Sequence, residues 1–356
     1  MKYQRILITG GCGFVGSSIA LYIKKSYPNI KIICLDNFIR KGSKLQVQRL
    51  KNADIEVIEG DVRFYDHLKK ITADLLIDCS AEPSVSAGLD GSSKYLVETN
   101  LVGSFNCLEW AKENKAALLF LSTSRVYSIE QLEKIPFTEG ETRFEWMNNN
   151  LAKDRTQQGI TKNFSTQGPI SLYGATKLSS EHLVLEYSRM YDIPAIINRF
   201  GVIAGPWQMG KVDQGFIALW VARHYFNRSL SYNGYGGLGK QVRDFLHIDD
   251  ICSLILKQVN QLENYRGETF QVGGGRNNST SLLELTKLCE EISQNKIEFQ
   301  KVENTHSNDI RILLLDSEIV KKEFHWKVEK NIYHLVKDVY QWILTNEDMV
   351  REIFCG

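Results

Sequence analysis

The chain has 356 residues, 43% of them hydrophobic, which is enough to bury a large core in one big or two interleaved domains. Its 43 basic and 42 acidic residues leave a net charge of +1, so no overall charge indicates nucleic acid or an anionic membrane as a partner. The 7 cysteines are scattered without C-x-x-C spacing, which argues against a disulfide framework and a zinc site and fits a reducing cytoplasm.

The first predicted elements are a strand, a glycine-rich turn and a helix. The apolar run 6–8 starts so early that we expect no signal peptide, and no run in the chain has membrane-spanning length. Gly10, Gly13 and Gly16 allow backbone N–H groups to approach a pyrophosphate at the N-terminus of the following helix, where the helix dipole favours negative charge. This pattern is typical of a dinucleotide site.

A carboxylate follows the second predicted strand, 32–35. Asp36 stands twenty positions after Gly16, where an acidic residue is expected to bind the adenosine ribose hydroxyls, so the pattern favours NAD over NADP. Arg40 and Lys41 lie close behind it. They are either ligands of a 2′-phosphate or a solvated surface pair.

Strands and helices continue to alternate along the chain. Further strands are predicted at 55–59, 75–79, 117–121 and 194–200, and a long helix at about 95–114. Such alternation predicts an α/β Rossmann fold, a doubly wound parallel sheet whose ligands sit beyond the carboxyl ends of its strands. Asp61, at a strand end, either receives the adenine amino group or caps a helix. Asn100, taken alone, is a solvated polar residue of the long helix.

The candidate catalytic residues follow the fifth strand. Tyr173 and Lys177 are four apart, so on a helix they share one face and can act on one proton. A tyrosine hydroxyl with an unperturbed pKa of about 10 is a poor base at neutral pH, but a nearby ammonium favours the phenolate. Ser122 and Thr123 reach the same sheet edge, where a hydroxyl completes a three-part site. Separately these are turn and helix-surface residues, but together they predict proton abstraction from an alcohol.

The rest of the chain is assigned to a smaller lobe and a long insertion. We expect residues 1–203, returning near 240–264, to form the dinucleotide-binding domain, and 204–239 with 265–356 to form a smaller α/β lobe. The polar stretch 128–170 is predicted to be a lid or substrate loop. Arg243 and Arg311 are candidate phosphate ligands, because guanidinium forks match phosphate oxygens, and His247 is expected to begin a helix.

In order and spacing, these residues resemble the extended short-chain dehydrogenase/reductase family of NAD-dependent sugar-nucleotide epimerases and dehydratases. The resemblance covers almost the whole chain, and its elements are the turn 9–16, Asp36 with Asn37, residues 60–62, Asn100 with Gly103, Ser122 with Thr123, Tyr173 with Lys177, and Arg243 with Asp244 and His247. Within the family, the chain is similar to the branch of CDP-paratose 2-epimerases over residues 36–42, 142–144, 213–215 and 239–244.

The resemblance implies a role for each matching residue. It makes Tyr173 the base, Lys177 the residue that lowers the Tyr173 pKa and binds the nicotinamide ribose, and Thr123 the hydroxyl that holds the reacting oxygen. The NAD-binding residues, besides Tyr173 and Lys177, would be Gly10, Gly13, Phe14, Val15, Gly16, Asp36, Asn37, Arg40, Asp61, Val62, Ser80, Ala81, Asn100 and Ser122. The substrate-binding residues, besides Thr123, would be Glu82, Ser84, Asn198, Gln214, Arg243 and Arg311.

The implied activity is epimerisation of a nucleotide sugar through a transient keto sugar, with CDP-paratose converted to CDP-tyvelose at carbon 2. A homodimer or homotetramer would pair through the helices near 95–114 and 173–191. Dehydratases of the family carry an Asp-Glu pair directly after the Thr, whereas Ser124 and Arg125 stand here, which disfavours dehydration. Glu82 is not typical of the CDP-paratose branch, so a UDP-hexose 4-epimerase with the same residues stays open. The alternative outside enzymes is an NAD-binding regulator on this fold.

Overall fold

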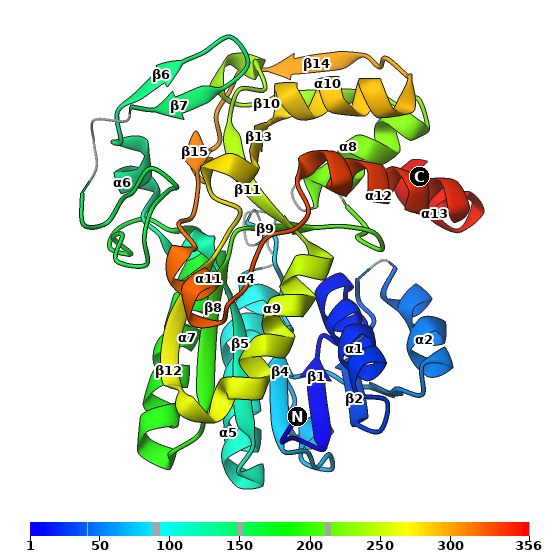
Figure 1. Ribbon diagram of the computed structural model, residues 1–356, viewed down its shortest axis with the longest axis vertical. Coiled ribbons are helices and arrows are strands. Elements are labelled where there is room, and N and C mark those ends of the chain that lie inside the picture. Colours follow the sequence, from blue (N-terminus) through cyan, green and yellow to red (C-terminus); the bar gives the residue numbers. More distant parts are fainter. Residues whose placement is uncertain (41, 86, 88–92, 148–151, 211–214, 356) are drawn as a thin grey trace.

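The computed structural model describes residues 1–40, 42–85, 87, 93–147, 152–210 and 215–355. Its centre is a seven-stranded sheet in which neighbouring strands are parallel, in the order β12-β8-β5-β4-β1-β2-β3 (Figure 1). The strands are β1 (Arg5–Thr9), β2 (Lys31–Asp36), β3 (Glu56–Glu59), β4 (Leu75–Asp78), β5 (Ala117–Thr123), β8 (Ala195–Phe200) and β12 (Arg266–Val272). The strand order reverses beside β1, where a doubly wound sheet opens a crevice for its ligand. The predicted fold class is confirmed.

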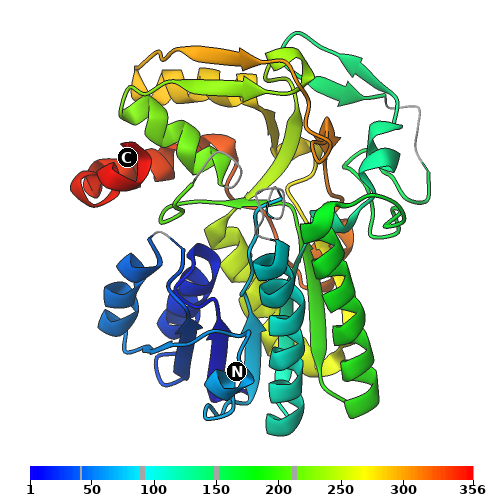
Figure 2. The same cartoon turned by 180° about the vertical axis from the view of Figure 1, so that it is seen from behind.

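Helices cover both faces of this sheet, because alternate side chains of each strand point to opposite faces. Ile6 and Ile8 of β1 join the core that contains α1 and α9, whereas Leu7 joins the core that contains α5 and α7. Figure 1 shows α1 and α9 in front of the sheet, and Figure 2 shows the opposite layer. The first layer holds α1 (Phe14–Ser26), α2 (Ser43–Asn52), α9 (Ile248–Gln261) and α11 (Glu318–Glu323), and the second holds α3 (Tyr65–Leu68), α4 (Ser93–Val97), α5 (Gly103–Asn114) and α7 (Ser171–Tyr191).

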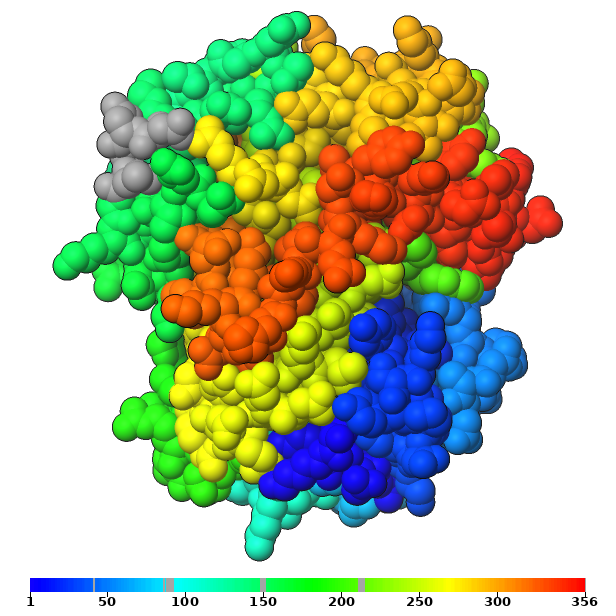
Figure 3. All heavy atoms as spheres, in the orientation of Figure 1, coloured from blue at the N-terminus to red at the C-terminus, as the bar shows by residue number. Residues whose placement is uncertain are grey.

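A smaller α/β lobe lies beyond the carboxyl ends of the main strands. Its strands are β9 (Val202–Ala204), β11 (Val242–His247), β13 (Ser279–Ser281) and β15 (Ile312–Leu313) in one sheet, and β10 (Leu230–Asn233) with β14 (Phe299–Val302) in another. Its helices are α8 (Phe216–Tyr225), α10 (Leu282–Ser293), α12 (Ile332–Thr345) and α13 (Glu347–Cys355). The space-filling view shows the orange and red C-terminal segment running across one face from the sheet domain to this lobe (Figure 3).

The predicted domain boundaries change at the segment that follows α9. The segment 265–272, predicted to open the smaller lobe, instead forms β12, which pairs with β8 and buries Phe270 and Val272 in the core of the main sheet. The chain therefore returns to the sheet once more than the sequence pattern indicates. His247 does begin α9: its Nδ1 accepts the Asp249 N–H at 3.1 Å, as expected.

The described residues of the polar stretch 128–170 are a folded part of the molecule. Its elements are α6 (Ile129–Glu133) and a hairpin of β6 (Phe137–Glu139) and β7 (Phe144–Trp146). Arg143 donates to Glu284 at the start of α10 at 2.6 Å, and Ile160 N–H donates to the Leu314 carbonyl at 2.9 Å. These contacts fasten the stretch to the smaller lobe. In the described part of the chain, no helix combines the length and apolar character needed to cross a membrane.

Candidate active site

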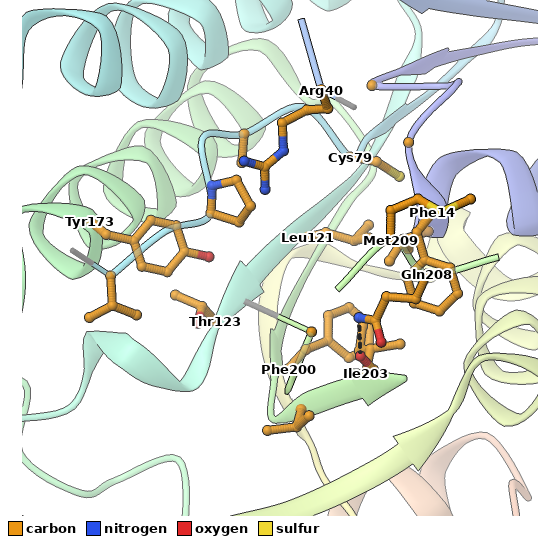
Figure 4. Close-up of a pocket in the computed structure, with 18 of the residues that line it drawn as sticks. Phe14, Arg40, Cys79, Leu121, Thr123, Tyr173, Phe200, Ile203, Gln208 and Met209 are labelled. Carbon is orange, nitrogen blue, oxygen red and sulfur yellow. Dashed lines mark hydrogen bonds between the residues drawn. The ribbon is translucent and has the colours of Figure 1, made fainter. Parts of the chain in front are cut away.

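A cleft of about 600 Å³ separates the carboxyl ends of the main strands from the smaller lobe (Figure 4). The residues predicted for the site that line this cleft are Gly10, Gly13, Phe14, Val15, Gly16, Asp36, Asn37, Arg40, Asp61, Val62, Ser80, Ala81, Ser122, Thr123, Tyr173, Lys177 and Arg243. None of the described residues of 128–170 lines it; Arg143, for example, pairs with Glu284 of the smaller lobe instead, and the lid or substrate loop stays a prediction.

The glycine turn after β1 is too tight for side chains. Gly10 has φ of 61°, and a Cβ there would lie 2.8 Å from the Cys79 carbonyl oxygen. A Cβ at Gly16 would lie 2.4 Å from the Gly10 carbonyl oxygen. The turn is closed by a bond from Gly13 N–H to the Gly10 carbonyl at 3.0 Å. The N-terminus of α1 thus presents backbone N–H groups to the cleft, which suits a pyrophosphate.

Two carboxylates follow β2 and β3. Asp36 accepts the N–H groups of Cys12 at 3.0 Å and Phe38 at 2.9 Å, and burial raises the pKa of Asp36. Asp61 accepts from Arg63 at 2.8 Å and from the amide of Asn37 at 3.0 Å. Asp61 does not cap α3, whose N-cap is Phe64, so of the two predicted roles the helix cap is wrong.

The adenosine end of the cleft contains a polar atom without a partner. The hydroxyl of Thr99, which is buried, lines the cleft with Val62 and Tyr95 and has no hydrogen-bond partner among the described residues. A buried hydroxyl is normally hydrogen-bonded, so this one is explained by a polar ligand. Together with the glycine turn and Asp36, it makes this part of the cleft fit NAD.

Arg40 crosses the cleft rather than pointing to solvent. Its Nη1 lies 3.3 Å from Glu82 Oε1, and Figure 4 shows it over the same cavity as Tyr173. The same Glu82 oxygen accepts the Ser84 N–H at 3.1 Å. The surface-pair alternative is therefore wrong for Arg40, while Lys41 lies outside the described residues. Glu82 and Ser84 do not line the cleft; the hydrogen bond between them lies next to Pro83, which does line it.

Tyr173 and Thr123 meet at the far end of the cleft. Tyr173 is 8% exposed, and its hydroxyl faces Thr123 from α7 (Figure 4). Burial raises the pKa of Tyr173, while the Thr123 hydroxyl and the charge of Arg125 act to lower it and Glu82 acts to raise it. Burial outweighs the nearby cations because it disfavours the charged phenolate. The pKa therefore lies above the ordinary value in this structure, contrary to the lowering expected from Lys177.

Lys177 is buried one helical turn from Tyr173. It is 2% exposed, and its Nζ lies 4.0 Å above the Phe120 ring. Burial lowers the pKa of Lys177, whereas the carboxylates of Asp78 and Glu181 act to raise it. The two carboxylates thus favour the charged form of a lysine that lies next to the place where an alcohol would lose its proton.

Asn100 supports the site from outside the cleft. It is fully buried in the π-helical turn between α4 and α5, so the prediction of a solvated side chain is wrong. Its Oδ1 accepts the Glu82 N–H at 2.8 Å, and its Nδ2 donates to the Glu82 carbonyl at 3.0 Å. Asn100 thereby fixes the backbone between β4 and the cleft edge. It is not among the residues that line the cleft.

Three predicted substrate-binding residues do not join the cleft. The amide of Asn198 exchanges hydrogen bonds with Gln258 at 2.7 and 2.9 Å, and both side chains are fully buried, so its predicted contact with substrate is wrong. Arg311 Nη1 forms an ion pair with Glu133 at 3.1 Å and does not line the cleft. Gln214 lies outside the described residues.

Sequence reasoning missed several residues that line the cleft, among them Arg125, Asn308 and Gln208. A signal existed only for Arg125, which follows Thr123 by two positions at the carboxyl end of β5. Asn308 and Gln208 come from connections of the smaller lobe, where no local pattern indicates which side chains face the sheet.

Residues 6–273 match the model of the NAD dependent epimerase/dehydratase family. The chain is 27% identical over 349 residues to a CDP-paratose 2-epimerase of Salmonella typhi, covering 95% of this chain and 99% of that protein. It is 25% identical over 377 residues to a dTDP-glucose 4,6-dehydratase of Escherichia coli, covering 99% and 96%.

Solved structures share the fold at lower identity. The UDP-glucose 4-epimerase of Thermotoga maritima superposes with a TM-score of 0.76 at 22% identity, covering 96% of this chain and 99% of that one. Pal from Bacillus thuringiensis superposes with a TM-score of 0.79 at 23% identity, with the same coverage.

Proposed function

Because the chain belongs to the NAD dependent epimerase/dehydratase family, we propose that it inverts carbon 2 of a nucleotide sugar, with CDP-paratose as substrate and CDP-tyvelose as product. Membership of this family makes it an enzyme with NAD as its cofactor. The match to the CDP-paratose 2-epimerase over nearly the full length of both chains supports the choice of sugar.

One observation supports epimerisation over dehydration. Ser124 and Arg125 stand where the resemblance expects the acid and base of a dehydratase. In the described part of the chain, the carboxylates that line the cleft are Asp36, Asp61 and Asp309, and none belongs to the strand end that carries Thr123. Removal of water needs a proton donor for the departing hydroxyl, whereas epimerisation needs one base for one alcohol.

The chain's own residues supply the proton chemistry of this reaction. NAD, when bound, accepts a hydride from the sugar and returns it. Tyr173 acts as the phenolate, which the positive charge of Lys177 would stabilise. It removes the proton of the sugar hydroxyl and becomes the neutral phenol, while Thr123 hydrogen-bonds the same oxygen. After the keto sugar has turned over in the cleft, Tyr173 gives the proton back, and the configuration is inverted without net oxidation.

The test is incubation of the purified protein with CDP-paratose in deuterated buffer without added cofactor, followed by NMR. CDP-tyvelose without deuterium at carbon 2 is expected, since the hydride never leaves the active site. Tyr173→Phe is the matched control and should form product about 10²- to 10⁴-fold more slowly. If no tyvelose forms even with NAD⁺ supplied, the choice of CDP-paratose is wrong. Conversion of a UDP-hexose in the same assay would then assign 4-epimerisation.

We also propose that two copies pair through α5 and α7. These adjacent helices expose large apolar side chains: Phe105 is 42% exposed, Met190 69% and Tyr191 45%. Val102, the residue just before α5, is 40% exposed. Light scattering of the protein as it elutes from a size-exclusion column should give at least twice the monomer mass of 40.7 kDa. Phe105→Lys should shift the protein toward monomer, whereas Ile319→Lys, at an exposed apolar residue on α11, should not; a monomeric wild type would contradict the proposal.

A further inference from the structure

Arg125 lies between the catalytic group and the smaller lobe. It follows β5 in the tight turn Ser124–Val126 and lines the cleft with Tyr173 and Arg243. Its N–H donates to Thr123 Oγ1 at 3.2 Å. Its carbonyl packs so closely on α7 that a Cβ at Gly174 would lie 2.3 Å from the carbonyl oxygen. The backbone of Arg125 therefore contacts both Thr123 and Gly174, the residue that follows Tyr173.

The guanidinium of Arg125 has five N–H donors, more than its one hydrogen bond to a described residue uses. Its Nη1 donates to the Asn308 carbonyl at 3.0 Å, and it forms no ion pair with a carboxylate in the ranges that the structure describes. Arg243 Nη1 donates to the Val242 carbonyl at 2.8 Å and, within the same ranges, also has no ion pair. Burial and the neighbouring Arg243 lower the pKa of Arg125 to about 10, although Asp309 acts to raise it. Two partly buried like charges are unfavourable unless an anion joins them.

Arg311, the other expected phosphate ligand, is already engaged. It forms an ion pair with Glu133 at 3.1 Å, and its guanidinium lies 4.0 Å from the ring of Phe137. Its charge is compensated by a direct ion pair, which Arg125 and Arg243 lack among the described residues. The sequence indicated Arg243 and Arg311 as phosphate ligands, whereas Arg243 and Arg125 line the cleft.

We propose that Arg125 and Arg243 together bind the phosphate bonded to the sugar, and that Arg125 thereby determines which carbon reacts. This inference rests on the proposed function, because it requires a nucleotide sugar in the cleft. Forked guanidinium groups bind phosphate oxygens through paired charge-assisted hydrogen bonds.

The consequence for the reacting carbon follows from the sugar's connectivity. The phosphate is attached to the anomeric carbon, to which carbon 2 is bonded, whereas carbon 4 lies across the ring. Arg125 is fixed to Thr123 and to the helix turn of Tyr173. A phosphate held by Arg125 keeps the anomeric carbon near the base, so the hydroxyl that reaches Tyr173 is the one on carbon 2.

The first experiment uses CDP and UDP, which lack the sugar, as calorimetric probes of the NAD-loaded protein. Loss of charge-assisted contacts to phosphate should weaken binding about 10- to 100-fold in Arg125→Met and in Arg243→Met. Arg311→Met is the matched control and should leave the affinity unchanged. Arg125→Lys keeps the charge without the fork and should bind with intermediate affinity, which decides the point if the Met variant does not fold. Unchanged affinity in the Arg125 variants, or a loss confined to Arg311→Met, would overturn the assignment.

The second experiment locates the reacting carbon. CDP-paratose with deuterium at carbon 2 should turn over more slowly than the unlabelled sugar, and CDP-paratose with deuterium at carbon 4 should not. Slowing by the carbon 4 label would overturn the positional role of Arg125. If the wild type does not convert CDP-paratose at all, the proposed function fails, while the CDP and UDP affinities still decide whether Arg125 binds phosphate.

Discussion

Glu181 of α7 and Arg199 of β8 form a buried ion pair below the active site, and breaking it should cost several kcal/mol. Arg199 Nη2 lies 2.6 Å from Glu181 Oε2, and Nε lies 3.0 Å from both carboxylate oxygens. The side chain of Arg199 is 12% exposed and that of Glu181 is 5% exposed. Ser122 also donates to Glu181. Glu181→Gln keeps the shape but leaves a buried guanidinium without its counter-charge, which costs about 3–5 kcal/mol.

The assay is thermal and urea unfolding of the NAD-loaded protein. With an unfolding entropy of about 2.1 cal/mol/K per residue, a chain of 356 residues loses about 1.3 °C of Tm per kcal/mol, so Glu181→Gln should melt at least about 4 °C below the wild type. The double variant Glu181→Gln/Arg199→Met removes the stranded charge and should be less destabilised than the sum of the two single variants. A cost below about 1 kcal/mol for Glu181→Gln, or strict additivity in the double variant, would refute the reasoning.

Three further predictions concern the active site. Tyr173→Phe should lower turnover by about 10²- to 10⁴-fold at unchanged Tm, and comparable turnover in the two proteins would show that another group is the base. Gly16→Ala places a Cβ 2.4 Å from the Gly10 carbonyl oxygen, so the purified variant should contain less NAD by absorbance; full NAD content would contradict a pyrophosphate site at this turn. Glu82 raises the pKa of Tyr173, and a base acts only after losing its proton. Glu82→Gln should therefore move the rising limb of the kcat/KM profile to lower pH, and a shift to higher pH would be inconsistent with this electrostatic role.

Local spacing accounts for the parts of the fold and site that the sequence predicts well. The contact between Gly16 and Gly10 lies within one turn, and Tyr173 and Lys177 share one helix face, so residue types and short separations suffice. The parallel sheet follows from the repeated alternation of apolar runs and helices. The sequence pattern assigns β12 to the smaller lobe, because its residues are those of any strand and do not indicate which sheet it joins. Only its pairing with β8, about seventy residues earlier in the chain, reveals where it belongs.

The sequence does not indicate whether a single polar residue is buried or exposed. Asn100 and Asn198 have the same side chain, and the sequence offered a solvated position for one and a substrate contact for the other. In the structure both amides are fully buried and serve the scaffold: Asn100 binds the Glu82 backbone, and Asn198 binds Gln258. Which amide faces a ligand is decided by the element packed against it, and neither partner can be inferred from the neighbouring residues.

The two arginines show the same limit for charge. Arg311 and Arg125 are equally plausible phosphate ligands by residue type, and only Arg311 belongs to a matching position of the family. Glu133, distant in sequence, neutralises Arg311, while no described carboxylate pairs with Arg125. A buried cation without an ion pair is unstable unless a ligand supplies the counter-charge, so the arginine that has no ion pair with a described carboxylate is the one whose charge remains for the substrate. Because Thr123 holds the backbone of that arginine, the catalytic centre and the phosphate site would share one short turn of chain.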